Sequence, residues 1–324
     1  MICLGIESTA HTFGIGIADD NGKILANIKD SFTTEQGGMI PTEVAKHHKA
    51  CYKKVIEKAL KSAKIKLEKI KLISFSQGPG LAPCLHVGLN VAKELSEKID
   101  VPVIGVNHCI AHLEIGNLVT GATNPVLLYA SGANTQIIAY EGEKYRIFGE
   151  TLDLGVGNFI DSFARYMGIG FPGGPKIEKL ALKGEKFIEL PYVVKGMDIS
   201  FSGILTNLKQ KFDSKKLSKN DLSYSMQETI FAMLLEVSER AMAHCNKNEL
   251  LLGGGVCCNK RFKEMAEKMC SERGSKCFIP SNDLLVDNAA MIAWLGIIEH
   301  KAGVKTKLEI KPYQRTDQID VKWR

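Results

Sequence analysis

The sequence predicts an α/β protein made of two related lobes with a cleft between them. Residues 2–28 follow the order strand, polar tip, strand, turn and strand, and a helix is expected at about 41–63. After Gly121 the same order returns in residues 125–148, with a helix expected at about 157–167. Chance is one explanation, because β-meanders are common. The matching position of the two polar tips favours internal duplication of one unit.

Apolar runs bounded by turn residues predict the elements of the first half. Asn21-Gly22 tolerates positive φ and favours a hairpin turn. Pro41 suits the first turn of a helix. The elements expected here are strands at 2–6, 13–18 and 23–28, a helix at about 41–63, a strand at 72–76, a tight loop at 77–80, a helix ending near residue 98 and a strand at 101–106.

In the second half, apolar residues at helical spacing predict a long helix at about 221–245. Asn259 is suited to cap a later helix. The other elements expected are strands at 125–129, 136–140 and 144–148, a helix at about 157–167, a glycine-rich loop at 168–174, a short helix from about 175, a strand at 250–252, a strand at 277–280 and a final helix from Asp287 to about 300.

The length of 324 residues corresponds to about two domains. We expect an N-terminal lobe of residues 1–121, joined by the C-terminal helix and tail at about 290–324. The C-terminal lobe would comprise residues 122–289, with an insertion at about 185–217. A hydrophobic content of 45% with moderate charge is typical of a soluble globular protein.

Composition also limits location and partners. No apolar run reaches membrane-spanning length, and no basic leader precedes the first strand, so neither a membrane nor a secretory signal is expected. Nine scattered cysteines without a Cys-x-x-Cys pair favour a reducing compartment, hence the cytoplasm. The net charge of +6 permits a nucleic-acid partner without demanding one.

Lysines follow one face of the helix at about 41–63. Such a face is either simply solvated, or it contacts an acidic partner or a phosphate backbone. The lysines are Lys46, Lys49, Lys53, Lys54, Lys58 and Lys61.

Residues 107–112 contain two histidines four positions apart. On a helix, His108 and His112 would project from one face, either as ordinary polar residues or as two ligands of a metal ion. Asp287, at a helix start, and Tyr129, at a strand end, are the candidates for further ligands. Two histidines and one carboxylate suit iron(II) or zinc, and a tyrosinate would favour iron.

Polar and glycine-rich loops at strand ends indicate a nucleotide site. The tips at residues 7–11 and 129–135 would face each other across the cleft and present N–H groups and hydroxyls, which hold phosphates. The glycines at 253–255 lead into the helix capped by Asn259, whose amino end carries a positive dipole.

A fourth loop contains Gly173 and Gly174, which would let backbone approach a flat base. Asp161 and Glu178 would then lie near ribose hydroxyls. Each loop alone is weak evidence, since glycine often serves only a turn. Four such loops at strand ends together point to a nucleotide.

Six motifs occur in order along the chain: Asn107-His-Cys-Ile-Ala-His112, Ser131-Gly-Ala-Asn-Thr-Gln136, Phe171-Pro-Gly-Gly-Pro175, Ser200-Phe-Ser-Gly203, Gly253-Gly-Gly-Val256 and Asp287-Asn-Ala-Ala-Met291. This set resembles the universal family of tRNA N6-adenosine threonylcarbamoyltransferases, formerly named O-sialoglycoprotein endopeptidases. Its archaeal and eukaryotic branch is the catalytic subunit of the KEOPS complex. The resemblance implies the actin-like ATPase, sugar kinase and Hsp70 superfamily, with two duplicated ribonuclease H-like lobes and a central cleft.

The resemblance implies a metal-dependent acyl transfer. The threonylcarbamoyl group would pass from threonylcarbamoyl-AMP, made by a separate synthase, to N6 of adenosine 37 in tRNAs reading codons that start with adenine, forming t6A. It also implies one divalent metal ion per subunit, iron or zinc, and binding of ATP or ADP. The implied partners are tRNA, a small atypical protein kinase that is fused to the chain in some members, and a small dimeric subunit.

The family's site residues can be carried over position by position. Its metal ligands match His108, His112, Tyr129 and Asp287. Its nucleotide contacts match Tyr129, Ala130, Ser131, Gly132, Ala133, Asp161, Gly174, Glu178 and Asn259. The general base is not assigned; Glu7 and His11 are candidates because their tip faces the cleft.

Some positions depart from the family pattern. Ala133 stands where the family usually has a second glycine, and Cys257-Cys258 replaces small residues. His11-Thr12 stands where bacterial members tend to have acidic residues, which favours the archaeal or eukaryotic branch. Because the chain ends at Arg324, it is either a stand-alone form or one domain of a kinase fusion.

Two other enzyme classes compete with this interpretation. A metalloprotease with two helical histidines would place a glutamate directly after the first, but Cys109 follows His108. A sugar kinase or ATPase of the same fold would need an acidic base near a sugar hydroxyl and no histidine pair in its cleft. A scaffold role that uses the lysine face would add to the transferase function.

Overall fold

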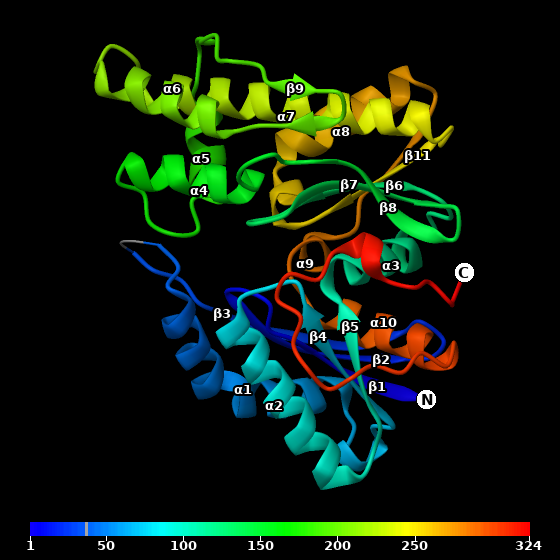
Figure 1. Ribbon diagram of the computed structural model, residues 1–324. Coiled ribbons are helices and arrows are strands. Elements are labelled where there is room, and N and C mark those ends of the chain that lie inside the picture. Colours follow the sequence, from blue (N-terminus) through cyan, green and yellow to red (C-terminus); the bar gives the residue numbers. More distant parts are fainter. Residues whose placement is uncertain (36–37) are drawn as a thin grey trace.

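The first sheet of the protein holds the amino terminus at its centre. In the computed structural model, which describes residues 1–35 and 38–324, this sheet has the order β3-β2-β1-β4-β5 (Figure 1). Strand β1 pairs antiparallel with β2 and parallel with β4. The strands are β1 (Ile2–Glu7), β2 (Thr12–Asp19), β3 (Ile24–Ser31), β4 (Leu72–Gly78) and β5 (Val103–Asn107).

The second sheet repeats the first. Its order is β12-β11-β6-β7-β8, and β6 pairs antiparallel with β7 and parallel with β11, as β1 does with β2 and β4. The same order and the same strand senses confirm the predicted duplication. The strands are β6 (Val126–Ala130), β7 (Thr135–Glu141), β8 (Lys144–Glu150), β11 (Glu249–Gly253) and β12 (Lys276–Phe278).

Helix α10 (Ala289–Lys301) packs on the first sheet although it comes late in the chain (Figure 1). Gly5 and Gly16 allow this approach, because a Cβ at either position would lie within 2.5 Å of the α10 backbone. We therefore propose that α10 belongs to the N-terminal lobe, as the expected division at about residue 290 requires. The other helices beside this sheet are α1 (Pro41–Ala63), α2 (Ala82–Ile99) and α3 (His108–Thr120), with a 3₁₀ turn, η1 (Leu67–Lys69).

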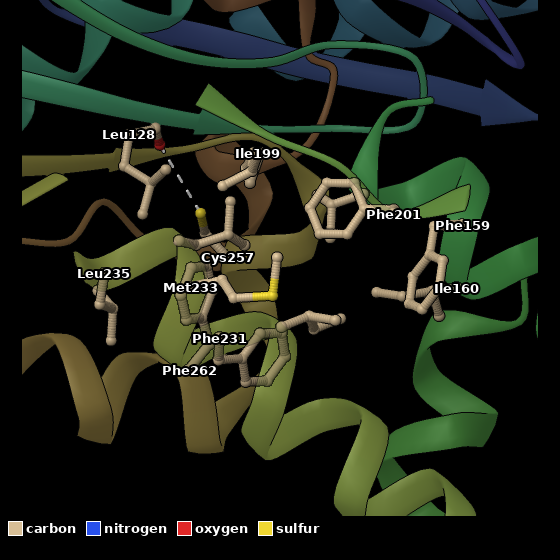
Figure 2. Close-up of a cluster of buried hydrophobic side chains, with 14 of the residues drawn as sticks. Leu128, Phe159, Ile160, Ile199, Phe201, Phe231, Met233, Leu235, Cys257 and Phe262 are labelled. Carbon is tan, nitrogen blue, oxygen red and sulfur yellow. Dashed lines mark hydrogen bonds between the residues drawn. The ribbon is translucent and has the colours of Figure 1, made fainter. Parts of the chain in front are cut away.

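The second lobe contains the largest cluster of buried apolar side chains among the described residues, on the face of its sheet that carries α7 (Lys219–His244). Phe231 on α7 stacks on Phe262, with ring centroids 4.4 Å apart (Figure 2). Its other helices are α4 (Val156–Tyr166), α5 (Gly174–Ala181), α6 (Ser202–Asp213), α8 (Lys260–Glu272) and α9 (Asn282–Leu285), with a 3₁₀ turn, η2 (Gly255–Cys258).

The predicted elements agree with the structure, with a few differences. Helix α6 was not expected; it lies within the segment interpreted as an insertion, yet buries Ile204 and Leu208 in the core. The same segment contains the two-stranded ribbon of β9 (Val194–Lys195) and β10 (Asp198–Ile199). The final helix begins two residues later than predicted, because Asn288 caps it by accepting a hydrogen bond from the Met291 N–H.

The C-terminal tail, drawn in red, passes between the two lobes (Figure 1). Its 3₁₀ turn η3 (Thr316–Gln318) follows Arg315, which pairs with Glu150 of β8 at 3.1 Å. Within the described part of the chain, no helix is both long and apolar enough to cross a membrane.

Candidate active site

A cavity of about 740 Å³ lies between the two lobes. Both predicted tips contribute to its wall, the first through Thr9, Ala10 and His11 and the second through residues 131–134. The tips meet here because each follows the central strand of its own sheet, β1 or β6. The duplicated topology therefore brings two distant loops to one site.

The histidine pair opens helix α3 at this cavity. Asn107 ends β5 and caps α3, because its side-chain oxygen accepts hydrogen bonds from the N–H groups of Cys109 and Ile110 at 3.0 and 3.1 Å. The four-residue spacing then places His108 and His112 on one face, with ring centroids 4.9 Å apart. Both imidazoles are almost fully buried.

Asp287 and Tyr129 complete a compact group of donor atoms around these rings. The Asp287 Oδ1 lies 3.4 Å from His108 Nε2 and 3.6 Å from His112 Nε2. The Tyr129 hydroxyl lies 3.0 Å from His108 Nε2. Asp287 is held by its neighbour Asn288, whose amide donates to the carbonyls of Leu284 and Val286.

The donor set fits a metal ion. The His108, His112 and Asp287 ligand atoms lie within 4.8 Å of one another. Among the described residues, neither ring nitrogen of His112 has a hydrogen-bond partner, although both are buried. Leaving a buried polar atom unpaired costs about 1–3 kcal/mol, so a ligand is expected there. Two imidazoles, a carboxylate and a phenol are donors suited to iron or zinc.

The charges of the group follow from burial and proximity. Burial lowers the pKa of His112, so this imidazole is neutral, the form that binds a metal. Burial disfavours ionised Asp287, but the close approach of its Oδ1 to the imidazoles of His108 and His112 outweighs this and holds its pKa well below the usual range. Burial raises the pKa of the Tyr129 phenol, so its deprotonation requires a nearby cation.

Glu7 lies behind this group rather than in the open cavity. It is fully buried, and its Oε2 lies 2.9 Å from His108 Nδ1. Its Oε1 accepts a hydrogen bond from the Thr9 N–H at 2.7 Å. A carboxylate on the remote nitrogen of a ligating histidine orients the ring and raises its basicity. In the sequence, Glu7 could be recognised only as a member of the polar tip. Nothing there indicated that it would contact a histidine.

We expect Glu7→Gln to weaken metal binding by about 10–100-fold, the usual effect of losing such an outer partner. The change removes the negative charge of the carboxylate beside His108 Nδ1 and keeps the side-chain volume. Metal affinity would be measured by competition with a chromophoric chelator. Glu35→Gln, on the exposed side of the loop after β3, is the control and should bind metal as the unmodified chain does. Equal affinity of Glu7→Gln and the control would contradict this role.

The predicted nucleotide residues mostly gather at the same cavity. Its wall includes Tyr129, Ser131, Gly132, Ala133, Asp161, Gly174, Glu178 and Asn259. Ala130 is the exception, because its side chain is buried in the core of the second lobe. The N–H groups of Gly132 and Ala133 have no acceptor among the residues that the structure describes, so they remain available to an anion.

Three of these side chains already have protein partners. Asp161 accepts a hydrogen bond from the Gly173 N–H at 2.7 Å, and burial raises its pKa. Glu178 accepts from the Lys260 N–H at 2.8 Å, at the amino end of α8. Asn259 caps that helix and donates to Gln227 at 2.8 Å. These bonds fix the loops around an apolar wall that includes Ile230 and Phe231.

The tail contributes residues that the motif analysis missed. Residues 312–316 line the cavity. Gln314 accepts a hydrogen bond from the Asn107 amide at 3.3 Å, which connects the tail to the cap of the histidine helix. No spacing or motif indicated this contact, because it joins distant parts of the chain.

Glu114, the nearest glutamate after His112, is not at the metal group. It accepts hydrogen bonds from the Tyr145 hydroxyl and the Trp323 indole, and it pairs with Arg324. It is therefore not placed to act as the base of a metalloprotease, which agrees with the sequence argument against that class.

Comparison with known proteins shows which family this chain belongs to. The family model of tRNA N6-adenosine threonylcarbamoyltransferase matches residues 23–294. The chain belongs to this family. A tRNA N6-adenosine threonylcarbamoyltransferase of Thermococcus kodakarensis is 55% identical over the full length of both chains, and one of Archaeoglobus fulgidus is 47% identical over the same extent.

A third relative within this threonylcarbamoyltransferase family is longer. It is named a probable bifunctional tRNA threonylcarbamoyladenosine biosynthesis protein, from Methanothermobacter thermautotrophicus. It is 50% identical over the whole of this chain, which spans 61% of its length.

Solved structures support the fold. HypF of T. kodakarensis has a TM-score of 0.65 at 14% identity, covering 96% of this chain and 49% of HypF. Component A of the Acidaminococcus fermentans (R)-2-hydroxyglutaryl-CoA dehydratase has a TM-score of 0.59 at 14% identity, covering 94% of this chain and all of that one. These likenesses confirm the expected actin-like ATPase fold.

Proposed function

We propose that this protein transfers the threonylcarbamoyl group from threonylcarbamoyl-AMP to N6 of adenosine 37 of tRNA, forming t6A and releasing AMP. The main observation behind the proposal is that His108, His112, Tyr129 and Asp287 form one group beside the cavity. The same cavity is lined by the polar and glycine-rich loops that the sequence predicts to bind a nucleotide. Family membership supplies the reaction, and the site supplies donors for a metal and space for an acyl adenylate.

The reaction exchanges one bond for another. The N6 nitrogen of adenosine attacks the carbamoyl carbon, the bond from that carbon to the AMP phosphate oxygen breaks, and N6 loses a proton. A bound metal ion would polarise and orient the acyl phosphate region. The tyrosine ligand favours iron, and zinc is the alternative. The free N–H groups of Gly132 and Ala133 would hold phosphate oxygens, and the apolar wall near Phe231 would take the adenine. The same loops would accept ATP or ADP.

Glu7 and His11, the two candidates for the general base, have different surroundings. Both Glu7 oxygens are engaged, one by His108 and one by Thr9, so Glu7 positions the histidine. His11 lines the cavity, and its ring meets Phe171 edge-on at 5.4 Å. We therefore propose His11 as the acceptor of the N6 proton.

The proposed partners are tRNA and the other KEOPS-type subunits. The name of the longer relative supports a second, fused activity in this pathway, for which we propose the small kinase. The lysine face of α1 is exposed, as a docking surface for a small dimeric subunit or a phosphate backbone requires. The cytoplasm is the proposed location, since all nine cysteines are free thiols.

The proposal is tested by reconstituted transfer. Labelled threonine, bicarbonate, ATP, the synthase, the partner subunits and tRNA are combined with this protein, and label on adenosine 37 is measured after nuclease digestion. We expect label to depend on this protein and to stay near background when position 37 is guanosine. Conversion of ATP to ADP by this protein alone, without labelled tRNA in the full mixture, would instead indicate an ATPase if inorganic phosphate is released, or a kinase if the phosphoryl group passes to an acceptor. Absence of both would reject the proposal.

A further inference from the structure

Tyr313 has surroundings that the proposed reaction does not yet explain. Its side chain is 93% exposed, more than any other large hydrophobic residue recorded as exposed in the described chain. It nevertheless lines the cavity between the lobes. A large aromatic ring that is exposed to water at the mouth of a binding site is stabilised when a ligand or partner covers its apolar face.

The backbone that carries Tyr313 is firmly held. The Lys311 N–H donates to the Gln77 carbonyl at 2.7 Å, and the Gly80 N–H donates to the Pro312 carbonyl at 3.1 Å. The Gln314 N–H closes the turn onto the Lys311 carbonyl at 3.0 Å. An exposed ring on a fixed turn is preorganised, because little backbone freedom remains to be lost on binding.

The turn is also fixed relative to the metal group. Gln314 bonds to Asn107, the residue that caps the helix of His108 and His112. The backbone of Tyr313 therefore keeps a set position at the mouth of the cavity, which the side chain lines together with His108, Tyr129 and Asp287.

The neighbouring charges argue for a flat neutral surface as the occupant. Arg315 is already paired with Glu150 at 3.1 Å and with Asp317 at 3.2 Å. Lys311 has Glu309 at 4.0 Å. Since both cations have carboxylate partners, the feature that remains unpartnered on this turn is the aromatic face.

We propose that Tyr313 stacks on an unpaired nucleobase of the RNA substrate, next to the adenosine that enters the cavity. This inference rests on the proposed function. Loop nucleotides present unstacked bases, and aromatic side chains recognise them by stacking, largely independent of base identity. The proposed place for the adenine of the acyl adenylate is the apolar wall near Phe231, so we assign the base on Tyr313 to the RNA.

The test compares Tyr313→Ala, Tyr313→Phe and Tyr192→Ala in the complete complex. Stacking is worth about 1–3 kcal/mol per base, so Tyr313→Ala should raise the KM for tRNA and the Kd for an anticodon stem-loop about 10-fold. Tyr313→Phe should keep both near the unmodified values, because the ring remains. Tyr192 is a half-exposed tyrosine that does not line the cavity, and its replacement should change neither. The KM for threonylcarbamoyl-AMP should stay constant throughout.

Three results would overturn the inference. One is an unchanged tRNA KM and stem-loop Kd in Tyr313→Ala. Another is an equal loss in Tyr313→Phe, which would assign the effect to the hydroxyl. The third is loss of a partner subunit from the complex with RNA affinity intact, which would make the ring a protein contact. Failure of the unmodified complex to transfer would reject the proposed function instead, and the stem-loop Kd would still decide the role of Tyr313.

Discussion

Replacement of His112 by alanine is expected to remove the bound metal ion and to lower transfer to tRNA by at least about 100-fold. Loss of an outer partner already costs about 10–100-fold, and His112 is proposed as a direct ligand. Both of its ring nitrogens are buried without a partner in the described residues, so the ring has no hydrogen bond to lose. Metal content per chain by elemental analysis and single-turnover transfer to tRNA are the two measurements.

The matched control for this change is His86→Ala. His86 lies exposed on α2 and does not line the cavity. This variant should keep one metal ion per chain and the unmodified transfer rate. Thermal melting of both variants separates a chemical effect from unfolding. A His112→Ala protein that keeps its metal and its rate would remove these residues from the proposed mechanism.

Replacement of Gly16 by alanine should disturb the site from a distance. The new Cβ would lie 2.2 Å from backbone atoms of Ala289 and Ala290, which cannot move without moving α10. Overpacking of this kind costs about 1–3 kcal/mol or more. Because Asp287 lies two residues before α10, displacement of the helix should also weaken metal binding. Chemical denaturation and chelator competition measure the two effects.

Gly14→Ala is the control on the same strand. Its Cβ would meet the Ala289 Cβ at 3.3 Å, a side-chain contact that needs a shift of only a few tenths of an ångström. This change should therefore have a much smaller effect on both unfolding and metal affinity. If the two variants are equally stable and bind metal equally, close packing of α10 does not position Asp287.

The sequence predicted the parts of the fold that depend on local order. The order of strand, polar tip, strand, turn and strand in residues 2–28 could be recognised again at 125–148, with Glu141-Gly142 in place of the Asn21-Gly22 turn, so the duplication followed from pattern alone. Helix α6 was missed because its segment was interpreted as an insertion, although Ile204 and Leu208 are buried. The local sequence pattern did not show that these two side chains would pack in the same core as α7.

The candidate site likewise has one part that the local sequence predicts and another that depends on the tertiary structure. The spacing of His108 and His112 and the cap at Asn107 are local, because one turn of helix brings such residues together. Asp287 was selected by its place at a helix start, but its approach to within 3.6 Å of both rings requires α10 to lie on β1 and β2. The contact between Glu7 and His108 required β1 and β5 to end at the same edge of one sheet.

The sequence by itself therefore determined the two repeated units, the helix with its histidine pair and the family to which the chain belongs. Each of these is encoded within a short stretch, where turn residues, caps and periodicity act directly on the backbone. Only the tertiary structure decided which carboxylate meets the histidines, what stands behind them, and that the tail returns to hold Tyr313 at the mouth of the cavity. Such contacts join residues far apart in the chain, and they form because burial and close packing select one arrangement of the whole molecule.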